Sequence, residues 1–145
     1  MPAQDVSWTP MLKESLGNDQ TKVNQLVFDF KVWQAKGGGD DDHVVFGKDG
    51  GNRDEKHVRH VHLIPASNAG KLRKWREAFR QKHSRKSNIY LIYAGGSPVF
   101  GFLLIDVLHD LDPGAHGIWA STYKTTRSIW ETMADAFLHF GTVPT

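Results

Sequence analysis

The residues best suited to chemistry lie in one short segment, His57–Ile64, which holds three histidines and an arginine among aliphatic residues typical of a strand. Successive strand side chains point to opposite faces, so we expect His60 and His62 on one face and Arg59 and Val61 on the other. An imidazole has a pKa of about 6.5, so two neighbours can divide acid and base work near neutral pH. Cleavage of a phosphodiester requires that chemistry; the alternative is a solvated strand without a chemical task.

Positive charge is concentrated in a second segment, although the whole chain carries only +2. Between Lys71 and Lys86, eight basic residues face one acid, Glu77, which gives a local charge of +7. The basic residues are Lys71, Arg73, Lys74, Arg76, Arg80, Lys82, Arg85 and Lys86. A polyanion is the natural partner of such a surface, and the alternative is a solvated helix followed by a basic loop.

Composition indicates one folded domain. The chain has 145 residues, of which 39% are hydrophobic and 11% aromatic, enough for a single core. It contains no cysteine, which excludes disulfides and thiolate nucleophiles and favours a cytoplasmic protein. No export signal is apparent, and the most apolar run, Phe100–Leu108, is too short to span a membrane and contains Asp106.

Hydrophobic periodicity predicts the order helix, strand, helix, strand, strand, helix. Apolar residues recur at helical spacing over Asn18–Lys36 and over the basic segment, and again around Trp130 in the last helix. Further predictions are a short helix near Met11–Leu16, a long loop over Gly37–Arg53, a strand over Lys56–Ile64 and a hairpin of Asn88–Tyr93 with Val99–His109.

This order predicts an α+β fold with a small, mostly antiparallel, curved sheet of three or four strands and helices on one face. The other face would be open and would carry His60 and His62. We expect residues 1–17 to be an N-terminal extension and residues 18–145 to be a single domain.

Several short blocks resemble a known family. They are Phe46–Asp49, His60–Leu63, Tyr90–Tyr93, Leu103–Ile105 and Met133–Phe137. In this order and spacing they are similar to the YafO family of toxins from bacterial toxin–antitoxin operons, within the wider RelE/ParE-like fold. The resemblance implies a RelE-like ribonuclease that cleaves mRNA on translating ribosomes, is neutralised by a cognate antitoxin protein and has no membrane partner.

The resemblance also indicates where this chain departs from RelE. RelE carries a Lys-x-Lys pair where this chain has His60 and His62, and an arginine where this chain has Tyr90. A lysine only neutralises charge at pH 7, whereas an imidazole can also accept a proton. Ordinary acid and base catalysis without a metal or other cofactor is therefore expected here.

Cleavage of RNA needs a base for the 2′-hydroxyl, positive charge near the phosphorane and an acid for the leaving oxygen. We expect His60 or His62 to be the base and the other to help hold the phosphate, without an assignment between them. His116 resembles a histidine that follows a proline in YafO and is the candidate acid. The alternative is that His116 is a surface histidine without a catalytic role. His109 is a weaker candidate.

Five further residues are candidates for nucleic-acid binding. Lys48, Lys74, Arg85 and Lys86 would contact phosphates, which position the protein without reading sequence. Tyr90 would stack on a base or donate a hydrogen bond to RNA. The alternative is that its ring only packs within the sheet, as strand tyrosines commonly do.

Two other functions remain open on the sequence. His60 and His62 could be metal ligands, with Asp106 or His109 as a third. Alternatively, the protein could be a non-catalytic inhibitor like ParE, which acts by binding a DNA-handling enzyme.

Overall fold

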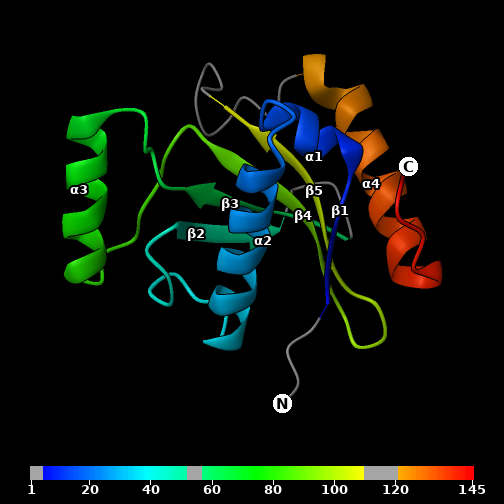
Figure 1. Ribbon diagram of the computed structural model, residues 1–145, viewed down its shortest axis with the longest axis horizontal. Helices are drawn as coiled ribbons and strands as arrows, with labels where there is room; N and C mark the ends of the chain where they lie inside the picture. The colour runs from blue at the N-terminus through cyan, green and yellow to red at the C-terminus, as the bar shows by residue number, and fades with distance from the viewer. Residues whose placement is uncertain (1–4, 52–56, 110–120) are drawn as a thin grey trace.

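The computed structural model describes residues 5–51, 57–109 and 121–145, which form one five-stranded sheet with helices packed around it (Figure 1). The strands are β1 (Val6–Trp8), β2 (Phe46–Gly51), β3 (Val58–Leu63), β4 (Tyr90–Ser97) and β5 (Gly101–Leu108), in the order β1-β5-β4-β3-β2. The helices are α1 (Pro10–Ser15), α2 (Gln20–Ala35), α3 (Ala69–Arg80) and α4 (Lys124–Phe140), and a short 3-10 turn, Ser121–Tyr123, precedes α4. The predicted α+β class is confirmed, with five strands in place of three or four.

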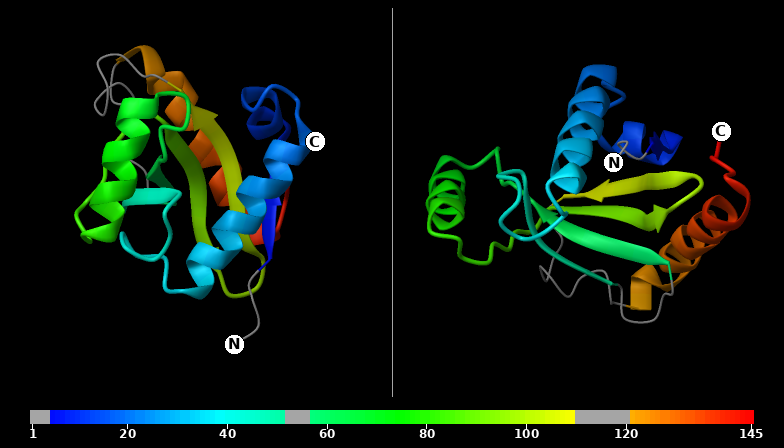
Figure 2. Two further views of the ribbon diagram at one scale, coloured as in Figure 1. Left: turned by 60° about the vertical axis from the view of Figure 1, so that its left-hand side comes forward. Right: turned by 90° about the horizontal axis from the view of Figure 1, so that it is seen from below.

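The sheet carries helices on both faces, so the prediction that they cover one face is wrong (Figure 2). Alternation along the central strands supplies two apolar surfaces. Val61 and Leu91 belong to a core with Phe30 and Trp33 of α2, whereas Ile92 belongs to a second core that is completed by α4. The last helix has an apolar stripe that must be buried, and the second sheet face is the surface that buries it.

The N-terminal residues contribute to the sheet and to the core. β1 pairs in parallel with β5, and Leu12 of α1 is fully buried in the α2 core. Thr9 caps α1, because its hydroxyl accepts the Leu12 N–H at 3.1 Å and donates to the carbonyl of Ile105 at 2.6 Å. The edge strand and first helix are thereby anchored to the middle of β5.

The segment Gly37–Arg53 was predicted as a loop, but its Phe46–Gly51 part is the edge strand β2, antiparallel to β3. Its composition gives little β propensity, and tertiary contacts supply what propensity lacks. Phe46 is fully buried and stacks on Trp33, with ring centroids 4.5 Å apart. Gly47 lies so close to the Arg85 carbonyl and the Trp75 ring that a Cβ atom would collide with both.

Helix α3 stands beside the sheet, near β2 and β3 (Figure 1). The apolar residues at helical spacing in this basic segment are Leu72, Trp75, Ala78 and Phe79. Of these only Trp75 is buried, and the other three are half-buried. No helix within the described ranges is both long and apolar enough to cross a membrane.

Candidate active site

His60 and His62 lie on the same face of β3, as strand alternation predicts. Their ring centroids are 6.2 Å apart, and the ring of Tyr90 lies edge-on to both, at 5.8 Å from His60 and 4.6 Å from His62. Tyr90 is placed there because it pairs with His62 in the antiparallel register of β3 and β4. These three side chains form what we call the histidine face.

His60 is half-buried, and its environment keeps the ring neutral at pH 7. Burial lowers the pKa of His60 because a charged ring loses hydration there. The charge of Asp49 opposes this shift, and the charges of Arg59 and Lys48 add to it. A neutral, partly exposed imidazole can accept a proton, which is what a general base must do.

His62 is only 4% exposed and is held by the backbone of Ser87. Nδ1 of His62 lies 2.8 Å from the N and 2.9 Å from the carbonyl O of Ser87, so this one residue fixes the orientation of the ring, and Nδ1 accepts or donates according to the tautomer. Burial lowers the pKa of His62 to about 4, and the charges of Lys86 and Lys48 add to this effect. His62 is therefore neutral near pH 7.

This burial predicts a pH-dependent stability. The unfolded chain protonates His62 near pH 6.5, whereas the folded protein resists protonation until about pH 4. The contribution of neutral His62 to the free energy of unfolding is therefore complete above pH 6.5. It decreases by about 3 kcal/mol as the pH falls to 4. His62→Asn keeps an acceptor for the Ser87 N–H without the titrating ring, so urea unfolding between these pH values should show a shallower loss. Equal slopes for both proteins would contradict the assignment.

Two exposed lysines border the histidine face. Lys48 extends from β2, where its N–H donates to the Arg85 carbonyl at 2.8 Å, and Lys86 follows Arg85 in the segment between α3 and β4. Both charges act on His62, and Lys48 also acts on His60. The two predicted phosphate ligands thus lie within electrostatic range of the imidazoles.

Tyr90 is the most buried side chain of this face, and its ring is too enclosed to stack on a nucleotide base. Its side chain is 1% exposed and packs in the α4 core with Ile92 and Trp130. Burial raises the pKa of Tyr90, and its hydroxyl finds no hydrogen-bond partner among the described residues. The predicted base contact is therefore wrong, and the ring supports the two imidazoles.

Arg85 is also inside the protein, so its predicted phosphate contact is wrong. The residue is 2% exposed, and its guanidinium donates to the carbonyls of Asp40, His43, Val44 and Phe46. The same group lies 5.0 Å from the Trp75 ring centre and 4.8 Å from that of Phe79. Its charge is used to hold the loop before β2, a role that the basic segment's composition does not reveal.

Arg59 has a structural role on the opposite face of β3. Its guanidinium donates to Asp49 at 2.8 Å, and the Tyr93 hydroxyl donates to the other oxygen of that carboxylate at 2.6 Å. This network ties β2 and β4 to β3. It keeps the strand in the register that presents the two histidines.

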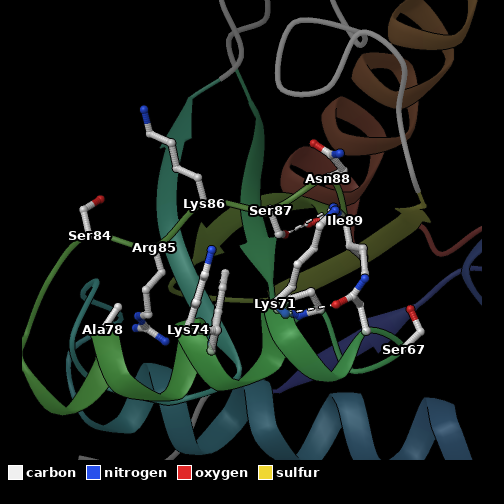
Figure 3. A pocket seen from close by; sticks show the side chains of 13 residues that line it. Ser67, Lys71, Lys74, Ala78, Ser84, Arg85, Lys86, Ser87, Asn88 and Ile89 are labelled. Atoms are coloured by element: carbon white, nitrogen blue, oxygen red, sulfur yellow. Dashed lines mark hydrogen bonds between the residues drawn. The ribbon is translucent and has the colours of Figure 1, made fainter.

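The remaining candidates lie elsewhere. His116 is outside the described residues, and His109 is exposed just after β5. Asp106, considered as a metal ligand, accepts a hydrogen bond from Ser15 at 2.5 Å. Within the described parts of the chain no group of three or more His, Cys, Asp or Glu side chains is arranged to hold a metal. Lys74 is exposed on α3 and lines a cleft beside Lys86 (Figure 3).

Comparison with known proteins gives one match. A family model described as toxin YafO of a type II toxin–antitoxin system matches residues 31–139, which include β2 to β5, α3 and most of α4. Neither the curated proteins nor the solved structures gave a match. The matched region contains the whole histidine face and covers most of the chain, so this protein belongs to the YafO family of toxins of type II toxin–antitoxin systems.

Proposed function

We propose that this toxin is a metal-independent endoribonuclease that cleaves mRNA, on the ribosome, and thereby inhibits translation. The observation that carries the proposal is the pair of neutral imidazoles on one face of β3, 6.2 Å apart and bordered by Lys48 and Lys86. RNA is the substrate that this set suits, because its 2′-hydroxyl supplies an internal nucleophile that needs only a base.

In the proposed reaction His60 removes the proton from the 2′-hydroxyl, since it is the more exposed of the two rings. The 2′-oxygen then bonds to phosphorus, and the bond from phosphorus to the 5′-oxygen breaks. The products are a 2′,3′-cyclic phosphate and a 5′-hydroxyl end. His116, which the resemblance suggests as the acid, would protonate the leaving oxygen.

His62 and the lysines would act on the phosphate itself. Ser87 orients the His62 ring, and in the tautomer that accepts the Ser87 N–H the Nε2–H would donate to a phosphate oxygen that reaches the small exposed part of the ring. Lys48 and Lys86 add positive charge where the phosphorane becomes more negative, and such preorganised charge stabilises a transition state strongly. The orientation of His62 by the backbone avoids reorganisation during the reaction.

The cognate antitoxin that family membership implies would inhibit by covering this site. An acidic partner complements the basic segment between Lys71 and Lys86, and it would shield the adjacent histidine face from RNA. Inhibition would then be steric.

The proposal is tested with purified protein and a reporter mRNA, with and without ribosomes, followed by primer extension. We expect discrete cuts with 2′,3′-cyclic ends that depend on ribosomes and persist in 1,10-phenanthroline, which removes zinc and iron but leaves the Mg²⁺ that ribosomes need. Cuts that 1,10-phenanthroline abolishes would support the metal alternative. An intact transcript under all conditions, together with loss of DNA gyrase activity, would favour an inhibitor of the ParE kind.

A further inference from the structure

A cleft of about 560 Å³ lies between α3 and the segment Ser84–Ile89 (Figure 3). α3 contributes Lys71, Lys74, Trp75 and Ala78 to it, and the facing segment contributes Ser84 to Ile89. In Figure 3 the side chain of Lys74 extends from α3 toward that segment. The volume is in the range of sites that hold small organic ligands.

The lining combines positive charge with uncharged polar groups. Lys71, Lys74 and Lys86 are exposed, and within the described parts of the chain none forms an ion pair. The uncharged polar residues are Ser67, Asn68, Ser84, Ser87 and Asn88, and Trp75, Ala78 and Ile89 add apolar surface. No carboxylate is among the lining residues that the structure describes.

This chemistry matches a nucleotide. Ammonium groups bind a phosphodiester, serine and asparagine side chains bind the edges of a base, and apolar surface covers its plane. Two of these side chains are already engaged, since Asn68 Oδ1 accepts the Lys71 N–H and Ser87 Oγ bonds to the backbone. An acidic peptide would also satisfy the lysines, but it carries no base to use the other three, Ser67, Ser84 and Asn88.

The cleft is joined to the histidine face by two residues. Ser87 lines the cleft, and its N–H holds Nδ1 of His62 at 2.8 Å. Lys86 also lines the cleft, and its charge acts on His62. Ser87 and Lys86 therefore connect the cleft to the histidine face.

We infer that this cleft is a substrate subsite that holds a nucleotide of single-stranded RNA near the cleaved bond, with phosphate against Lys71 and Lys74. The inference rests on the proposed function, because it takes RNA as the substrate. It adds a second contact region, on α3, where affinity and a preference for particular bases would arise.

The test measures binding of a 2′-O-methyl RNA oligomer, which lacks the attacking hydroxyl and cannot be cleaved. The double variant Lys71→Gln/Lys74→Gln removes two cleft charges, and we expect it to bind about tenfold more weakly near 0.15 M salt, with a salt slope lower by about 1.4. Arg73→Gln/Arg76→Gln is the matched control, since it removes two exposed charges of α3 that do not line the cleft. It should weaken binding by only about twofold, because screening limits distant charges.

A third variant tests occupation of the cleft without a change of charge. Ala78→Phe adds a ring to its wall, and it should weaken RNA binding while leaving the salt slope unchanged. Thermal unfolding of each variant checks that the fold is retained. Full affinity in a folded Ala78→Phe protein would overturn the inference.

The other outcomes are also decisive. Equal losses in the cleft pair and the control pair would show diffuse charge in place of a subsite. Unchanged RNA binding, with polyglutamate binding lost only in the cleft pair, would assign the cleft to an acidic peptide. The expected binding pattern without cleavage of ordinary mRNA on ribosomes would refute the nuclease proposal and leave the cleft as an RNA site.

Discussion

Replacing His60 with glutamine should lower the rate of RNA cleavage by about 10²–10⁴-fold, the usual contribution of general base catalysis. Glutamine has similar size and can form hydrogen bonds, but it cannot accept a proton from the 2′-hydroxyl. His60 is half-buried and flanked by His62 and Tyr90, so a residue of similar volume preserves the packing. The loss should fall on the chemical step and not on RNA affinity.

Single-turnover cleavage of a mapped transcript on ribosomes measures this effect, with circular dichroism to verify the fold. His57→Gln is the matched control, because His57 lies just before the same strand and faces Asp135 of α4 at 3.6 Å. The wild-type rate should rise with pH and level off below pH 6.5, since burial lowers the pKa of His60. A His60→Gln rate within threefold of wild type would remove His60 from the proposed base role.

Replacing Arg85 with methionine should lower the free energy of unfolding by about 3–4 kcal/mol, because buried carbonyls would lose their charged donor. Arg85 is 2% exposed and holds four carbonyls of the loop that leads into β2. Methionine fills much of the same space but donates no hydrogen bond. The edge strand that carries Lys48 would be the first element to loosen.

Urea unfolding at pH 7 measures this loss. Arg85→Lys is the informative companion, because it keeps the charge but not the planar set of donors, and it should recover only part of the stability. Lys86→Met is the surface control, since Lys86 is exposed and should change stability by less than about 0.5 kcal/mol. A fully stable Arg85→Met protein with weakened RNA binding would return Arg85 to the surface role first predicted for it.

Local patterns were sufficient for much of the fold. The helical spacing of apolar residues located α2, and the strand signals located β3 and the β4–β5 hairpin. β1 and β2 escaped detection because one is too short to show an alternating pattern and the other lacks a strand composition. β1 is three residues long and β2 reads Phe-Gly-Lys-Asp-Gly-Gly, so their neighbours in the sheet impose the extended conformation.

For the site, the shared face of His60 and His62 followed from the sequence, because alternation along a strand is a property of the backbone alone. Burial is different, since it depends on segments far apart in the chain. Arg85 and Lys86 are adjacent and chemically alike, yet one is enclosed by carbonyls of residues 40–46 and the other is exposed. The same long-range packing buried Tyr90, placed α4 on the second sheet face and brought Ser87 to His62, and no local pattern encodes which distant groups will meet.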